Sequence, residues 1–184
     1  MKSRSISSAD NSSYRPKIRI EEVSWAAREE DLGLIRTAVF IDEQKIDPSE
    51  EWDPGDRKAQ HLLAILDDQP VGCARIIDKN KIGRLAVLKH ARRKNVGSKL
   101  LRVAIEIIKR NGYVPTLNSQ TRAMAFYAKH GFLPKGPVFD EAGISHRQMT
   151  LSGGSNKTLT PLDAESLCFC TPTILVAIEP QIEN

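Results

Sequence analysis

The sequence predicts an α/β layer fold with a mixed sheet. Segments with strand-like alternation occur first as neighbours joined by short turns, which indicates local antiparallel pairing. Further along the chain, strands alternate with helices that carry one apolar face, which favours helices packed on a partly parallel sheet. The chain has 184 residues, of which 40% are hydrophobic, and this suits a single domain with a buried core.

The first quarter of the chain is predicted to pass from a disordered segment into a strand and a helix. Residues 1–15 are polar and serine-rich, so they cannot bury enough apolar area to offset the entropy of ordering. Residues 17–23 alternate as a strand does. Residues 28–44 carry a helical apolar stripe and acidic residues in the first turn. Turn-forming residues over 47–56 predict a loop.

Three consecutive strands are predicted in the middle of the chain. Residues 61–66 and 71–77 are apolar runs, and the turn chemistry of 67–70 joins them as a hairpin. A second turn at 78–80 leads into a strand over 81–88. These strands are predicted to form the centre of the sheet.

Helices and strands then alternate. Residues 98–110 carry an apolar helical face, and Asn111-Gly112 stops the helix in the way expected of a left-handed cap. A strand is predicted over 113–117 and a helix over 121–130, closed by Gly131. Extended structure restarts at Phe132 and Leu133, and residues 146–151 form a closing strand.

The chain is therefore divided into three parts. Residues 1–15 are the disordered N-terminal segment and 16–151 are the folded domain. Residues 152–184 are a linker, Gly- and Ser-rich at its start, followed by a tail to which no role is assigned. The apolar run 173–178 predicts one further strand, which could pair with a second subunit in a homodimer.

Composition favours a soluble protein in a reducing compartment. The odd count of three cysteines and the lack of a secretory signal predict a cytoplasmic location. No run approaches the roughly 18 apolar residues of a membrane helix, so no membrane association is expected. Cys168 and Cys170 are too close for a zinc knuckle, and no metal site is predicted. Cys73 is interpreted as a buried strand residue rather than a nucleophile.

Charge is unevenly distributed along the chain. Residues 89–110 hold eight Lys and Arg against one Glu, and residues 42–56 hold seven Asp and Glu against one Lys. One end of a site could therefore attract phosphates and the other a cationic amine. The alternative is that both runs are solvated surface patches.

A basic loop lies between the strand 81–88 and the helix that follows it. Successive backbone amides in a tight loop form an anion nest, and the dipole of the helix adds to it. The loop consists of Arg92, Arg93, Lys94, Asn95, Val96 and Gly97, and Ser98 opens the helix. The alternatives are a basic helix start without a ligand, or a contact to nucleic acid.

This loop resembles the Arg-x-x-Gly-x-Gly loop with which the GNAT superfamily of acetyl-CoA-dependent acyltransferases holds its cofactor. Asn95 stands where that family usually has glycine. Asparagine is the non-glycine residue that best tolerates left-handed backbone geometry, at a cost of about 1 kcal/mol. We therefore expect the loop to keep its shape. The property that the asparagine could change is the affinity for the cofactor.

A second segment, residues 120–132, resembles the GNAT helix that packs along the pantetheine arm and presents a tyrosine. Tyr127 matches that tyrosine, and a hydroxyl there can protonate the thiolate that leaves in acyl transfer. The alternative is a core aromatic beside Phe126. Both segments occur in the right order, and the resemblance covers roughly residues 17–151.

Further residues resemble the ElaA-like branch of this superfamily, whose acceptor is poorly defined. The matching residues are a Val-Phe-x-x-Glu-Gln segment ending at Glu43 and Gln44, an acidic loop with Glu51, Asp53 and Asp56, and the histidines His61 and His146. The carboxylates could attract an ammonium group, and either histidine could accept its proton. The alternatives are structural histidines, solvated turn carboxylates and a Gln44 that hydrogen-bonds the loop.

The resemblance implies a three-layer α/β/α sandwich with a mixed, bent central sheet splayed around the strand 81–88. It implies direct transfer of an acetyl group from acetyl-CoA to a primary amine of a small molecule or peptide, with Tyr127 as the acid. The cofactor-binding set would be Leu85, Ala86, Val87, the loop from Arg92 to Ser98, Asn118, Gln120 and Phe126, and the substrate-binding set Glu43, Gln44, Glu51 and Asp53.

Two other functions fit the same residues. One is a non-catalytic acyl-CoA-binding or regulatory module of the same fold, because a fold does not fix a function. The other is a nucleic-acid-binding module built on residues 89–110. Aromatic residues are not interleaved with those basic residues, and no helix-turn-helix or zinc pattern occurs, which argues against nucleic acid.

Overall fold

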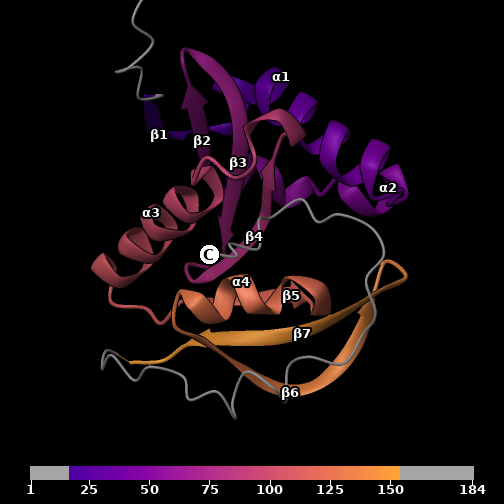
Figure 1. Cartoon of the computed structure of the whole chain (residues 1–184), viewed down its shortest axis with the longest axis vertical. Coiled ribbons are helices and arrows are strands. Elements are labelled where there is room, and N and C mark those ends of the chain that lie inside the picture. The colour runs from indigo at the N-terminus through magenta and orange to yellow at the C-terminus, as the bar shows by residue number, and fades with distance from the viewer. Residues whose placement is uncertain (1–16, 154–184) are drawn as a thin grey trace, which may run out of the picture.

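The structure is a computed structural model that describes residues 17–153. Its core is a seven-stranded sheet in the order β1-β2-β3-β4-β5-β7-β6. In Figure 1 the first four strands form the upper part of the molecule, and β5, β7 and β6 form the lower part. The strands are β1 Ile18–Val23, β2 Gln60–Leu66, β3 Gln69–Ile77, β4 Lys81–Val87, β5 Thr116–Gln120, β6 Phe132–Glu141 and β7 Ile144–Leu151.

Helices cover both faces of this sheet and complete the predicted layers. On one face, α3 (Val96–Arg110) packs on β2, β3 and β4, α4 (Met124–Lys129) packs on β5 and β6, and the apolar side chains of both helices share one core. On the other face, α1 (Trp25–Arg36) and the π-helix η1 (Thr37–Glu43) pack against alternate residues of the same strands. This α/β architecture confirms the predicted fold class.

The sheet is mixed, and its one parallel pairing, between β4 and β5, is short. All the other pairings are antiparallel. β4 and β5 are paired only at Lys81↔Thr116 and Ile82↔Leu117. Beyond these residues the strands separate, so the sheet is splayed at β4 as predicted.

A bulge in β4 accompanies this separation. The register against β3 shifts between Gly83 and Ala86, so one extra residue lies on the β4 side. Arg84 within this stretch has a φ of +49°. Bulges bend a strand and raise its twist, and this one begins where β4 leaves β5.

The region between α1 and β2 differs from the prediction. The helix begins at Trp25, capped by Ser24, and the backbone is non-helical at Arg28, where we predicted its start. The predicted loop 47–56 contains the short helix α2 (Pro48–Glu51) and the 3-10 helix η2 (Pro54–Lys58). Proline at the first helical position and Asp47 and Asp53 as caps explain both turns, because these residues start helices as readily as they form loops.

The later elements also have different limits from those predicted. Helix α3 begins at Val96 rather than at residue 98, and β5 covers 116–120 rather than 113–117. Strand β6 extends to Glu141, whereas extended structure was predicted only at Phe132 and Leu133. Two prolines and a glycine obscure its pattern, and they are tolerated because β6 is an edge strand with a register shift between Lys135 and Val138. The predicted linker from residue 154 onward and the strand 173–178 lie outside the described residues.

Candidate active site

The basic loop before α3 has the backbone shape predicted for an anion-binding turn. Asn95 lies in the left-handed region with φ +64° and ψ +17°, which confirms the expectation for this residue, and Arg93 has φ +60°. The amides of Val96, Gly97 and Ser98 precede the first donor of the helix, which is Lys99 N bonded to Asn95 O at 3.1 Å. No side chain among residues 17–153 caps this helix start, so these amides can receive an anion.

The side chain of Arg92 is turned away from this loop, against the prediction that it holds a diphosphate. Its Nε donates to Val87 O at 3.0 Å, and its two Nη atoms donate to the carboxylate of Glu43 at 2.8 and 2.5 Å. Arg92 is the leading cause that lowers the pKa of Glu43. Both side chains are thereby committed to each other, so Glu43 is not the free substrate carboxylate that we predicted.

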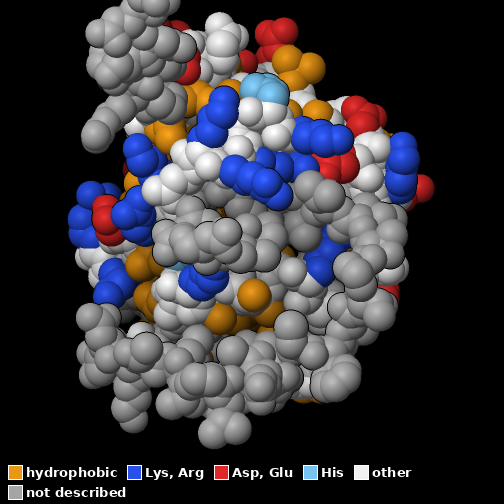
Figure 2. Space-filling model, viewed as in Figure 1, with side chains coloured by type: hydrophobic (Ala, Val, Ile, Leu, Met, Phe, Trp, Pro, Cys, Tyr) orange, Lys and Arg blue, Asp and Glu red, His pale blue; other side chains and the backbone are white. Residues whose placement is uncertain are grey.

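Exposed basic side chains remain on the loop. Arg93 and Lys94 are exposed and form no ion pair within the described residues. On the face seen in Figure 2, Lys and Arg side chains are more frequent than Asp and Glu, so this face attracts anions. The loop itself therefore offers amides and two mobile charges rather than a fixed arginine.

Strand β4 supplies unpaired backbone at the gap between β4 and β5. Leu85, Ala86 and Val87 lie beyond the last residue of β4 that pairs with β5. Their side chains are buried in the two cores, Leu85 and Val87 on one face and Ala86 on the other. Only their backbone is therefore presented toward the gap, and unpaired amides there can bind the amides of an extended arm.

Tyr127 reaches this gap from α4. Its side chain is 7% exposed and lines a cavity of about 170 Å³ together with Leu85. Within residues 17–153 no hydrogen bond to the Tyr127 hydroxyl is found. Burial raises the pKa of Tyr127 well above its ordinary value, so the hydroxyl keeps its proton at neutral pH. An unpartnered, protonated hydroxyl in a cavity is a proton donor without an acceptor.

Phe126 lies beneath the loop rather than in the cavity. Its ring contacts Tyr127 at 5.1 Å and His130 at 5.0 Å between centroids. Its tip would lie 3.7 Å from a Cβ at Gly97, and Ser98 Oγ bonds His130 Nε2 at 3.1 Å. Phe126 was predicted to bind the cofactor, and the structure makes it part of the packing that supports the loop.

Strand β5 places two polar residues that were predicted to bind the cofactor in the cavity wall. Asn118 and Gln120 alternate with buried residues, so both face the cavity. Asn118 Nδ2 donates to Glu141 Oε2 at 3.1 Å, and Gln120 Nε2 donates to Gln44 Oε1 at 2.8 Å. Gln44 was predicted either to bind substrate or to hydrogen-bond the loop. Its side chain instead accepts a bond from Gln120 on β5, and it lines the cavity.

The two predicted catalytic histidines have different surroundings. His146 lies opposite Gln120 on β7, lines the cavity and is stacked on Phe139 at 6.1 Å. Its Nδ1 is 2.7 Å from Ile144 O, and because a carbonyl only accepts, Nδ1 carries the hydrogen. The neutral ring therefore has its lone pair on Nε2, for which no partner is found in the described part of the chain.

His61, in contrast, is buried away from the cavity. It is 1% exposed, its ring packs on Trp25 at 5.4 Å, and its Nε2 lies 2.8 Å from Asp56 O. Burial lowers the pKa of His61, so the ring is neutral and Nε2 carries the hydrogen. This position corrects the prediction of a catalytic role for His61, because no substrate in the cavity can reach it.

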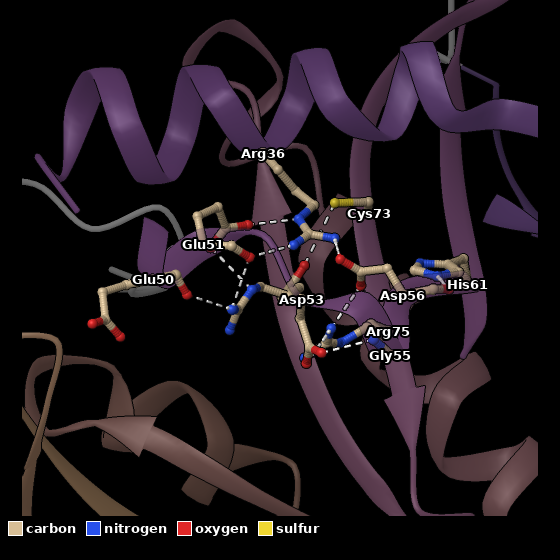
Figure 3. Close-up of polar contacts among 10 residues, drawn as sticks. Arg36, Glu50, Glu51, Asp53, Gly55, Asp56, His61, Cys73 and Arg75 are labelled. Atoms are coloured by element: carbon tan, nitrogen blue, oxygen red, sulfur yellow. Dashed lines mark hydrogen bonds and ion pairs between the residues drawn. The ribbon is translucent and has the colours of Figure 1, made fainter. Parts of the chain in front are cut away.

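The predicted amine-binding carboxylates belong to a buried network with arginines (Figure 3). Arg36 pairs with Glu51 at 2.6 Å and with Asp56 at 2.9 Å, and its guanidinium also lies against the rings of Trp25 and Trp52, at 5.4 and 5.0 Å from their centroids. Arg84 Nε is 2.9 Å from the second oxygen of Glu51. Glu51 and Asp56 are therefore neutralised from inside the protein rather than free to attract an ammonium group.

Asp53 lies at the outer end of this network. Its carboxylate accepts a hydrogen bond from Gly55 N at 2.8 Å and pairs with Arg75 Nη1 at 3.2 Å. The Gly55 amide first, and Arg75 after it, lower the pKa of Asp53. Asp53 does not line the cavity, which corrects its prediction as a substrate residue.

Five charged residues of the cavity wall were missed by the sequence reasoning. They are Glu50, Arg75, Lys81, Arg84 and Glu141. Arg75 and Lys81 could have been found by alternation, because each lies two residues from another cavity residue on its strand. Glu141 could not, because the length of the β6–β7 hairpin was not evident from its pattern.

Comparisons with known proteins show what this chain is similar to in sequence and in fold. Residues 27–152 match the family model of the acetyltransferase (GNAT) domain. The uncharacterized protein YyaT of Bacillus subtilis is 33% identical over 77% of this chain and 100% of its own length. ElaA of Escherichia coli is 30% identical over 61% of this chain and 79% of its length. The crystal structure of ElaA covers 74% of this chain and 100% of its own, with 26% identity and a TM-score of 0.65.

Two kinds of feature are not found in the part of the chain that the structure describes. No helix among residues 17–153 is long and apolar enough to cross a membrane. The same residues contain no group of three or more His, Cys, Asp or Glu side chains arranged to hold a metal ion.

Proposed function

Because the chain belongs to the GNAT acetyltransferase family, we propose that it transfers an acetyl group from acetyl-CoA directly to a primary amine. One observation carries the proposal: the Tyr127 hydroxyl and His146 Nε2 line the same cavity, and neither has a hydrogen-bond partner within residues 17–153. A proton donor and a proton acceptor that both lack partners suit a reaction that needs one of each.

The loop before α3 holds the diphosphate in this proposal. The free amides of Val96, Gly97 and Ser98 bind the phosphate oxygens, and the helix dipole stabilises their charge. Arg93 and Lys94 add mobile positive charge from the exposed side of the loop. The unpaired backbone of Leu85, Ala86 and Val87 binds the pantetheine arm, and an amide there polarises the thioester carbonyl.

His146 acts as the base and Tyr127 as the acid. Amines are protonated at neutral pH, and His146 Nε2 removes one proton so that the nitrogen can attack the thioester. As the C–S bond breaks, Tyr127 donates its proton to the sulfur. Burial raises the pKa of Tyr127, so the hydroxyl carries its proton before each turnover.

Arg92 is assigned a positioning role. It joins the start of the phosphate loop to η1 through Glu43 and to β4 through Val87 O. These are the two walls between which the arm and the acceptor must meet. Arg92 therefore fixes the loop relative to the cavity without touching the diphosphate.

Two measurements test the proposal together. The purified protein is titrated with acetyl-CoA in a calorimeter, with CoA and ATP as controls, and thiol release is then followed with a panel of primary amines. We expect micromolar binding that needs the pantetheine part, and thiol release that depends on the amine. Acetyl-CoA binding without thiol release for any amine would support the non-catalytic acyl-CoA-binding alternative. A lack of acetyl-CoA binding would refute the proposal that the loop before α3 holds the diphosphate.

A further inference from the structure

The floor of the cavity on the β3–β4 side is open and flanked by basic side chains. Gly83 lines this floor, and a Cβ placed on it would have no atom within 4 Å. Arg75 lies directly opposite Gly83 in the antiparallel pairing, and Ile77 opposite Lys81. Paired residues share a face, so Arg75 and Lys81 are diagonal neighbours, with Cβ atoms roughly 7–8 Å apart across the vacant position of Gly83.

Arg75 has donors that the protein does not use. Its side chain is 5% exposed, and its ion pairs with Asp53 and Asp56 are both made by Nη1. Its Nε is buried without a hydrogen-bond partner in the described structure, and no bond there involves Nη2. A buried guanidinium with unused donors is costly, and an anionic group on its open side would offset that cost.

Lys81 adds a cation that, unlike Arg75, is not paired with a carboxylate in the described structure. Its side chain is half-buried and lines the cavity, and it forms no ion pair within residues 17–153. Arg84 lies next to Gly83 but is paired with Glu51. Two other carboxylates of the cavity form no ion pair within residues 17–153. Glu141, on the β6–β7 hairpin, accepts a hydrogen bond from Asn118, and the carboxylate of Glu50, on α2, points away from the arginines in Figure 3.

The cavity therefore has a defined polarity. The floor around Gly83 carries unused positive donors, and the reactive groups Tyr127 and His146 lie on the walls formed by α4 and β7. An acceptor that spans the cavity must place its amine at the reactive groups and its other end on the floor. The reaction determines where the amine of the acceptor lies. The positive charge of the floor determines that the group at the other end of the acceptor is an anion.

We propose that this floor is a carboxylate-binding subsite, formed by Arg75 and Lys81 around Gly83, and that the acceptor is an amino acid. This inference rests on the proposed function for the role of the amine, while the subsite itself is a statement about anion binding. The acceptor carboxylate pairs with Lys81 Nζ and with Nη2 of Arg75, because Arg75 Nε is itself buried, and its amino group lies toward His146.

Binding is tested first with compounds that cannot react. In the presence of CoA, the protein is titrated by calorimetry with N-acetyl amino acids and with the matching N-acetyl amino acid amides, which lack only the carboxylate charge. For the side chains that bind, we expect the acids to bind about tenfold or more tightly than the amides. Equal affinities would overturn the subsite, whether or not the protein catalyses any transfer.

Variants of Lys81 locate the effect. Lys81→Gln is expected to reduce the preference for the acid to about threefold or less, and Lys81→Glu to reverse it in favour of the amide. Lys79→Gln removes an exposed charge two residues away and serves as the matched control, with the preference unchanged. An unchanged preference in both Lys81 variants would refute the assignment.

Gly83→Val provides a second variant that keeps the fold, because the added side chain enters open space and valine suits a strand. Filling the floor should weaken binding of the N-acetyl amino acids at least tenfold while leaving CoA affinity unchanged. Unaltered binding of the acids would place the carboxylate elsewhere and overturn the proposal. Transfer assays with free amino acids and amino acid amides then distinguish the subsite from the proposed function. If the acids bind in a way that depends on Lys81 but no acetyl group is transferred to any of them, only the proposed function is refuted.

Discussion

Among single side chains, Tyr127 and His146 carry the reactive atoms of the proposed chemistry, and neither the Tyr127 hydroxyl nor His146 Nε2 has a hydrogen-bond partner within residues 17–153. Asn118 and Gln120 beside them are each held by another side chain. A buried polar group without a partner costs roughly 1–3 kcal/mol of stability. Proteins keep such groups mainly where a ligand completes the bonding, so these two residues are the ones to test by substitution.

Replacement of Tyr127 by phenylalanine tests the acid directly. Tyr127→Phe removes only the hydroxyl, so we expect kcat to fall about ten- to a thousandfold with little change in the dissociation constant of acetyl-CoA. Steady-state kinetics and calorimetry measure the two quantities. Tyr113→Phe is the control, because Tyr113 is 40% exposed and lies outside the cavity. An unaltered kcat in Tyr127→Phe would remove Tyr127 as the acid.

The buried hydroxyl also predicts how stability depends on alkaline pH. Since burial raises the folded-state pKa of Tyr127, its contribution is complete below the unfolded-state pKa of about 10 and is lost as the pH rises above it. The free energy of unfolding should then fall by up to about 1.4 kcal/mol more per pH unit in the wild type than in Tyr127→Phe. Denaturant titrations between pH 9 and 11 measure the difference, and parallel pH profiles of the two proteins would contradict it.

Among the secondary-structure elements, the loop before α3 combines two separable tasks. Its backbone shape depends on Asn95 and Arg93, which both have positive φ. Its place in the molecule depends on Arg92, which reaches across to Glu43. Shape and placement can therefore be changed one at a time.

Asn95 is the residue with which to change the shape. Glycine adopts φ near +64° without steric cost, whereas alanine pays about 1 kcal/mol there. We expect Asn95→Gly to bind acetyl-CoA at least as tightly as the wild type, and Asn95→Ala to be about 1 kcal/mol less stable. Calorimetry and urea denaturation give both values. A large loss of affinity in Asn95→Gly would mean that the asparagine side chain itself contacts the cofactor.

Substitutions of the neighbouring residues Arg92 and Arg93 distinguish the placement of the loop from its binding of an anion. Arg92→Gln breaks the pair with Glu43 and should lower the free energy of unfolding by about 1–3 kcal/mol. Arg93→Gln removes an exposed charge, so stability should stay within about 0.5 kcal/mol while affinity for CoA falls about three- to tenfold. The loss in Arg93→Gln should shrink at high salt, because the contact is exposed. The reverse pattern, with the affinity lost only in Arg92→Gln and its stability intact, would restore Arg92 as a diphosphate ligand.

For the whole molecule, the sequence predicted the layers and the phosphate loop because these depend on local rules. Strand alternation, helix stripes and the tolerance of Asn95 for left-handed geometry can all be read within a few residues. The pairings of charged groups could not be predicted, since Glu51 meets Arg84 and Glu43 meets Arg92 only after the sheet has formed. A carboxylate in an acidic run looks free until the strand that carries its partner is placed.

The buried network of Arg36, Glu51, Asp56 and Arg84 joins α1 and α2 to the splayed strand β4 (Figure 3), so it is expected to hold the acceptor wall in place. Glu51→Gln leaves the buried Arg36 and the partly buried Arg84 short of a negative charge and should cost about 3–5 kcal/mol of unfolding free energy. Glu50→Gln, at the adjacent exposed position, should change it by less than about 0.5 kcal/mol. Urea denaturation of the two variants compares them. If Glu51→Gln proved as stable as Glu50→Gln, the network would not support the wall, and the rigidity of the cavity would have to come from the apolar packing of α1 alone.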